Sequence, residues 1–157
     1  MELRAALIGC GGLGKVHAQM VQQVGGMTMS AFCDVDAARA EQLRQEFHGD
    51  YATSDPAKIF ADPNINVVYI CTHHDTHAEY CIRAARAGKH IMVEKPLALT
   101  SAACTEIGQG VEETGVSKLI AAKKAVTPET AIALEEVFSV PAERFLALQR
   151  DLDLAKA

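Results

Sequence analysis

The chain has 157 residues, of which 49% are hydrophobic and 22% are charged, and its formal net charge is −5. This balance is typical of a soluble globular protein with one ordinary domain, or one domain and an appendage. No apolar run is long enough to span a membrane, and the N-terminus lacks the pattern of a secretory signal, so we expect a cytoplasmic protein without a membrane partner.

Short apolar runs alternate with helical patterns over the first 115 residues. The runs predicted as strands are residues 3–8, 27–33, 51–53, 66–71 and 90–93. The helical spacing of Leu13, Val16, Met20 and Val24 predicts one helix, and a second is predicted over Ala78–Ala85, before Gly88. Three more are predicted to begin after the capping residues Asp36, Asp55 and Thr100. Because strands that alternate with helices form parallel sheets, the sequence predicts an α/β fold, a Rossmann-like doubly wound sheet.

The pattern changes after Gly115. Residues 117–124, 127–138 and 141–154 all have helical spacing, and no strand is predicted between them. We therefore divide the chain near residue 116 into an α/β domain, residues 1–115, and an all-helical C-terminal tail, residues 116–157. The first part carries the whole net charge and the tail is neutral.

The loop after the first predicted strand has the glycine spacing of a phosphate-binding turn. Gly9, Gly11 and Gly14 form a G-x-G-x-x-G pattern between a strand and a helix, with Gly12 and Leu13 inside it. The first glycine allows a tight turn, the second lets the backbone approach a pyrophosphate, and the third lets helix and strand pack closely. The pattern predicts a nicotinamide dinucleotide site here. A purely structural turn is the alternative.

An acid at the end of the second predicted strand indicates which dinucleotide is bound. Asp34 lies 20 residues after Gly14, where a carboxylate would accept hydrogen bonds from a ribose. Such a carboxylate repels a 2′-phosphate, so NAD is favoured over NADP. NADP stays possible because Arg39 is close in the sequence.

Several segments resemble the Gfo/Idh/MocA oxidoreductases. They are residues 9–17, residues 33–36, residues 69–72 with His77, and residues 87–97. The most specific is Glu94-Lys95-Pro96, directly after a predicted strand. The resemblance covers about residues 3–115, which correspond to the family's N-terminal NAD(P)-binding Rossmann domain.

The resemblance implies roles for the residues that follow the fifth predicted strand. It places Lys95 near the nicotinamide and the substrate, as a catalytic and cofactor-binding residue. Glu94 and Pro96 would shape this part of the cofactor site, commonly with a cis peptide bond before the proline. A solvated loop lysine is the alternative for Lys95.

Other implied positions surround the end of the fourth predicted strand. Thr72 and His77 would lie beside the cofactor, and His17 one turn into the first helix, although either histidine could be an ordinary helix-surface residue. His73 stands where the family usually has a proline. The spacing of His73 and His77 also suits a metal, but no further ligand cluster is visible, so no metal site is predicted.

The family reaction is hydride transfer between NAD(P) and a sugar, cyclitol or related alcohol. It implies a second α/β domain that holds the substrate and supplies acid–base groups, yet no histidine follows His90. Acid–base catalysis needs a group within hydrogen-bond reach of the proton that it moves. We therefore expect dinucleotide binding with weak or no turnover by this chain alone, a small-molecule substrate only with a second domain, and a possible homo-oligomer.

The tail resembles the C-terminal part of a HigA-type helix-turn-helix antitoxin. The similarity lies in residues 116–131 and the apolar positions after them, while the family's earlier helices are missing and Arg144 and Ala147 depart from its pattern. One alternative function is therefore a regulator that binds DNA or a toxin through the tail. Another is a non-catalytic dinucleotide sensor. DNA is not an expected partner, because the tail is neutral.

The five cysteines indicate a reducing compartment. They are odd in number, widely spaced and without a C-x-x-C pair, which argues against a disulfide framework and a zinc site. Each is interpreted as a small buried apolar residue.

Overall fold

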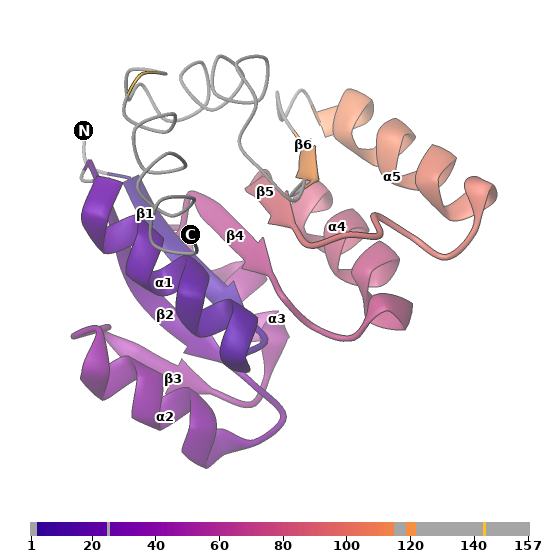
Figure 1. Cartoon of the computed structure of the whole chain (residues 1–157). Coiled ribbons are helices and arrows are strands. Elements are labelled where there is room, and N and C mark those ends of the chain that lie inside the picture. The colour runs from indigo at the N-terminus through magenta and orange to yellow at the C-terminus, as the bar shows by residue number, and fades with distance from the viewer. Residues whose placement is uncertain (1–2, 25, 115–118, 122–142, 144–157) are drawn as a thin grey trace.

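The computed structural model describes residues 3–24, 26–114, 119–121 and 143. Within these residues, six parallel strands form one sheet in the order β3-β2-β1-β4-β5-β6 (Figure 1). The strands are β1 (Leu3–Ile8), β2 (Met27–Cys33), β3 (Tyr51–Thr53), β4 (Val67–Ile70), β5 (His90–Val93) and β6 (Leu119–Ala121). This strand order is that of a doubly wound Rossmann sheet, which confirms the predicted fold class.

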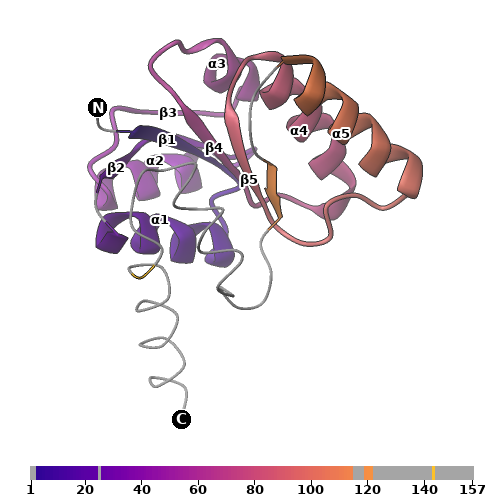
Figure 2. The ribbon, with the colours of Figure 1, turned by 90° about the horizontal axis from the view of Figure 1, so that it is seen from above.

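Helices cover both faces of the sheet. Figure 2 shows α1 and α2 on one face and α3, α4 and α5 on the other. Their bounds are α1 (Gly12–Val24), α2 (Ala37–Glu46), α3 (Pro56–Ala61), α4 (His77–Arg86) and α5 (Ser101–Thr114), and a short 3-10 turn, η1 (His74–Thr76), precedes α4. No helix in the described ranges has the length and apolar character needed to cross a membrane.

The helix starts follow from capping side chains, as the sequence predicts. The Asp36 carboxylate accepts a hydrogen bond from the backbone amide of Ala38 at 3.0 Å. Asp55 accepts one from the amide of Ala57 at 2.9 Å, with Pro56 in the first turn. These side chains satisfy amides that have no partner inside their helices.

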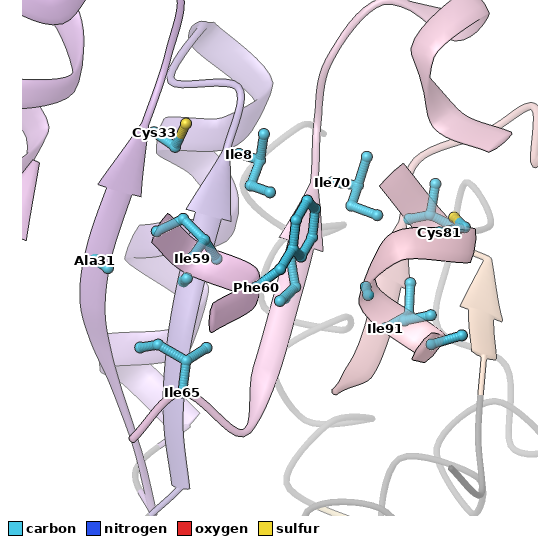
Figure 3. Close-up of a cluster of buried hydrophobic side chains, with 14 of the residues drawn as sticks. Ile8, Ala31, Cys33, Ile59, Phe60, Ile65, Ile70, Cys81 and Ile91 are labelled. Atoms are coloured by element: carbon cyan, nitrogen blue, oxygen red, sulfur yellow. The ribbon is translucent and has the colours of Figure 1, made fainter. Parts of the chain in front are cut away.

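Two apolar clusters form the core, one on each face of the sheet. Side chains alternate along a strand, so Leu7 points toward the α1 and α2 layer and Ile8 toward the α3, α4 and α5 layer. Figure 3 shows the second cluster, where Ile59 and Phe60 of α3 approach Ile8 of β1. Burial on both faces explains why the central strands are continuous apolar runs.

Helix α1 buries a face other than the one that carries Leu13 and Val16. Leu13 and Val16 are 51% and 42% exposed, whereas Ala18 and Val21 are buried. Small residues at Gly14 and Ala18 let the helix lie close to the sheet. The predicted helix is confirmed, but close packing against the sheet determines which face it buries.

The helix predicted over residues 117–124 is wrong in its described part. Residues 119–121 form β6, which pairs in parallel with β5. Without a neighbour, β5 would leave backbone donors and acceptors unpaired at the edge of the sheet. This short apolar run pairs with them as a sixth strand. The helices predicted over residues 127–138 and 141–154 lie outside the described residues, apart from Glu143. The division near residue 116 stays a prediction.

The cysteines are free thiols, as predicted. Cys10, Cys33 and Cys81 are buried, while Cys71 and Cys104 are partly buried. Burial raises the pKa of Cys10 to about 12 and that of Cys33 to about 11, with a contribution from the nearby Asp34 charge. Both therefore stay protonated at neutral pH and behave as small apolar side chains.

Candidate functional site

Strand register brings most of the predicted site residues to one edge of the sheet. The last residues of β1, β2, β4 and β5 are in register with one another. The residues that follow them stand in a row at what we call the carboxyl edge, and they are Gly9, Asp34, Cys71 and Glu94. Because β1 lies between β2 and β4, the glycine loop is at the switch point of the sheet, where α/β proteins bind ligands.

Two glycines of the loop are required by the fold itself. Gly9 has φ +98°, and a Cβ there would lie 2.5 Å from the carbonyl oxygen of Cys71. A Cβ at Gly14 would lie 2.0 Å from the carbonyl oxygen of Gly9. Both positions thus hold strand, loop and helix closer together than any side chain allows.

The middle of the loop is open, in contrast. A Cβ at Gly11 or Gly12 would meet no other heavy atom within 4 Å. Helix α1 begins at Gly12, so its unpaired amides lie in this open region, and Leu13 beside them is half exposed. The arrangement fits a phosphate group approached by bare backbone. The predicted contacts of these three residues with a cofactor stay predictions.

Asp34 is buried and supports the glycine loop. One carboxylate oxygen accepts a hydrogen bond from the Cys10 amide at 2.7 Å, and the other accepts one from the Asp36 amide at 2.9 Å. Asp34 as a whole is only 7% exposed. Each oxygen can accept more than one hydrogen bond, so the carboxylate still has capacity for a ribose hydroxyl.

Arg39 lies beside this acid. Its guanidinium nitrogens lie 3.6 Å from carboxylate oxygens of Asp34 and of Asp36, and the side chain is half exposed. The structure thus places a cation next to the acid, as the sequence spacing of Arg39 suggested.

Glu94 is held by a histidine from the first helix. His17 Nε2 donates a hydrogen bond to a carboxylate oxygen of Glu94 at 2.7 Å, and both side chains are 13% exposed. This bond lowers the pKa of Glu94 below its ordinary value. The His17 ring also packs against Tyr69, with ring centroids 5.6 Å apart. His17 is therefore not an ordinary helix-surface histidine.

Lys95 follows in an exposed loop. The peptide bond between Lys95 and Pro96 is cis, as the resemblance implied. The Lys95 backbone amide donates to the second carboxylate oxygen of Glu94 at 3.2 Å. The catalytic role of Lys95 stays a prediction.

His77 ties this loop to the end of β4. The side chain is completely buried, with Nδ1 2.7 Å from the carbonyl oxygen of Pro96 and Nε2 3.1 Å from the carbonyl oxygen of Thr72. Both ring nitrogens thus face carbonyl oxygens of the protein's own backbone, and a neutral ring donates a hydrogen bond to one of them. The structure shows how His77 holds the loop, while its contact with a cofactor stays a prediction.

The segment after Thr72 adopts the backbone that a proline would have. His73 has φ −68° and ψ 149°, so the departure from the family pattern preserves the chain path. The Thr72 hydroxyl lies 2.7 Å from that of Thr76. Among the described residues no group of three or more metal-ligating side chains occurs, which leaves the His73 and His77 spacing without metal-site geometry.

Sequence reasoning missed two contacts at this site. It assigned Asp34 to a ribose but not to the Cys10 amide, and it did not pair His17 with Glu94. No local pattern signals the first, because Asp34 and Cys10 are 24 positions apart, and the tendency of an aspartate to accept from the amide two residues later accounts only for the Asp36 contact. Nothing local signals the second, since the two residues are 77 positions apart.

Comparisons with known proteins agree with this geometry. The Gfo/Idh/MocA family model, described as an oxidoreductase family with an NAD-binding Rossmann fold, matches residues 3–122. Myo-inositol 2-dehydrogenase of Thermotoga maritima is 31% identical over 118 residues, which are 75% of this chain and 34% of that protein. Scyllo-inositol 2-dehydrogenase (NAD(+)) of Bacillus subtilis is 38% identical over 116 residues, 73% of this chain and 34% of that protein.

A solved structure gives the same result. A levoglucosan dehydrogenase in complex with NADH and L-sorbose superimposes with a TM-score of 0.74 at 31% identity, over 85% of this chain and 38% of that chain. The chain spans about a third of the length of the curated relatives that it matches.

The helix-turn-helix interpretation of the tail gains no support. The family match runs to residue 122 and includes β6, so residues 119–121 belong to the sheet and not to a recognition helix. The rest of that resemblance lies outside the described residues. The alternative of a regulator acting through the tail is therefore set aside.

The family match agrees with the glycine loop, the acid after β2 and the loop after β5. The chain belongs to the Gfo/Idh/MocA oxidoreductases, of which it forms the NAD-binding Rossmann domain.

Proposed function

We propose that this chain holds NAD along the carboxyl edge and serves an oxidoreductase that moves hydride between NAD(P) and an alcohol carbon of a sugar or cyclitol. The observation that carries the proposal is the in-register row that places Asp34 and Glu94 on either side of the glycine loop. A dinucleotide is long and has two ends. The row provides an acid for one end and the Lys95 loop for the other.

At the adenosine end, Asp34 recognises the ribose. Its carboxylate has unused acceptor capacity, which suits the two hydroxyls of a ribose and opposes a 2′-phosphate. Arg39 reduces that opposition, because its guanidinium lies 3.6 Å from the same carboxylate. The chain therefore prefers NAD and tolerates NADP.

At the pyrophosphate, backbone amides replace side chains. Gly11 and Gly12 leave the approach to the start of α1 free. The helix N-terminus contributes roughly half a positive charge, which the phosphates would meet directly. Gly9 and Gly14 contribute by keeping this helix end at the switch point.

At the nicotinamide end, Lys95 is the chemically useful side chain. NAD, when bound, accepts or donates a hydride at its nicotinamide ring. An ammonium beside that ring can donate a hydrogen bond to the substrate oxygen and so steady the charge that changes there during hydride transfer. Lys95 is exposed in a loop, between Glu94, which His17 holds, and Pro96, which His77 contacts.

The names of the relatives support the proposed substrate class. Two of them are named for inositol isomers and a third for levoglucosan. Polyhydroxylated rings of this kind need several hydrogen-bonding groups, and this chain brings Lys95 to them. We propose that the remaining groups come from a second domain.

Titration of the chain with NADH, followed by nicotinamide fluorescence, tests the proposal. We expect saturable binding that Gly11→Val abolishes, because its side chain would occupy the open space over the loop. Gly108→Ala in α5 is the matched control, since a Cβ there also meets nothing within 4 Å but lies far along the chain from the loop. Absence of saturable binding, or binding indifferent to Gly11→Val, would overturn the proposal.

A further inference from the structure

Two histidines from different helices hold the loop that carries Lys95. His17 of α1 binds the Glu94 side chain, and His77 of α4 contacts the Pro96 carbonyl. Strand β5 itself ends at Val93, before this loop begins. The position of Lys95 is therefore set by side chains outside its own strand.

The His17 contact is the more direct of the two. Glu94 uses one carboxylate oxygen to accept from His17 and the other to accept from the Lys95 amide. The carboxylate thus joins the histidine ring to the backbone of Lys95. With 13% exposure on each side, this charge-assisted hydrogen bond is largely shielded from competing water.

His17 also lies on the helix that begins at the glycine loop. It is three residues after Gly14, within the first two turns of α1, and the Lys15 amide beside it donates to the Gly11 carbonyl at 2.9 Å. A ligand that binds the start of α1 acts on the same rigid element that carries His17. Tyr69 packs on the ring and limits its rotation.

We propose that His17 is a positioning residue, which through Glu94 aligns Lys95 with the nicotinamide end of a dinucleotide seated at the start of α1. The inference rests on the proposed function, because it assumes a dinucleotide at the glycine loop. His77 contacts Pro96 on the other side of Lys95, and the Glu94 amide donates to the Ile70 carbonyl of β4, so loss of the His17 contact would free the Glu94 side chain and the Lys95 amide that it binds while leaving Pro96 in place.

Acetylation of Lys95 by an N-hydroxysuccinimide ester, measured by mass spectrometry of the digested protein, reads this alignment directly. In the native chain, saturating NADH should slow acetylation of Lys95 about tenfold. Lys58, exposed on α3, should be unaffected and serves as the internal control.

Variants of His17 separate the effect of its N–H donor from that of the ring's shape. His17→Phe keeps a ring against Tyr69 and removes the donor, so NADH should still bind but should lose most of its protection of Lys95. His17→Gln restores an N–H donor and should recover protection. His48→Asn is the control histidine change, because His48 is exposed with φ +57° and asparagine tolerates that conformation.

Each result has a distinct meaning. Failure of the native chain to bind NADH overturns the proposed function. Native protection that His17→Phe leaves intact overturns the role of His17 while the proposed function stands. Where His17→Phe does not fold, Glu94→Gln takes its place, since it keeps the side-chain shape and weakens the bond. Unchanged protection in that variant at saturating NADH would equally overturn the inference.

Discussion

The Asp34 carboxylate lies 2.7 Å from the backbone nitrogen of Cys10, whose amide donates to it. The acid at the end of β2 therefore supports the glycine loop that follows β1, in addition to any contact with a ribose. Loop conformation and ribose recognition share one buried group. A change at Asp34 should affect the stability of the empty chain as well as its affinity for a dinucleotide.

Replacing Asp34 should separate these two effects. Asp34→Ala leaves the buried Cys10 amide without an acceptor, which costs about 1–3 kcal/mol of unfolding free energy, and it should also abolish NADH binding. Asp34→Asn keeps one acceptor oxygen, so it should lose less stability and should shift the preference toward NADPH. Urea unfolding and fluorescence titration measure the two effects. Glu106→Gln, on the exposed side of α5, is the control, and an Asp34→Ala variant of native stability would contradict the shared role.

Two glycines should respond in opposite ways to alanine. Gly14→Ala places a Cβ 2.0 Å from the Gly9 carbonyl oxygen, so α1 must move away from the loop at a cost of about 1–3 kcal/mol. Gly108→Ala meets nothing within 4 Å inside α5 and should stabilise the chain by about 0.5–1 kcal/mol. Thermal unfolding of both variants gives the comparison. Equal shifts of the same sign would show that the packing at Gly14 is not tight.

Glu94 should make stability fall at acid pH. Its pKa in the folded chain is below the ordinary value of 4.5, chiefly because His17 donates a hydrogen bond to the carboxylate. The unfolded chain therefore takes up this proton first, and the stabilisation is complete above pH 4.5 and lost as pH falls through the folded-state pKa. Unfolding free energy measured across this range should drop less steeply in Glu94→Gln. Identical pH profiles would show that the pair contributes nothing to stability.

A buried lysine should prove structural. Lys89 is 6% exposed, and its ammonium donates to the carbonyl oxygens of Asp62 and Ile65 at 2.5 and 2.8 Å. Lys89→Met keeps the aliphatic stem and leaves both carbonyls without that donor, which should lower the unfolding free energy by about 1–3 kcal/mol. Lys58→Met, on the exposed side of α3, is the matched control and should be close to neutral. A native-like urea midpoint for Lys89→Met would contradict this role.

Local patterns predicted most of the elements. The caps at Asp36 and Asp55 and the spacing of the glycine loop act over a few residues, so the sequence carries their effect directly. Helix α1 was predicted correctly, but packing against the sheet decides which face it buries, and that face carries Ala18 and Val21 while Leu13 and Val16 are exposed. Strand β6 was missed because a short apolar run can be helix or strand until a partner edge is known.

Short sequence patterns indicate where the chain turns, which residues cap its helices, and which loop is bare enough for a phosphate. Those features depend on neighbours within about one helical turn, so they are written in adjacent residues. The contacts of Asp34 with Cys10 and of His17 with Glu94 depend instead on how the strands are arranged in the fold. Parallel strands in register bring the ends of distant segments together, and no short-range pattern encodes which side chains then meet.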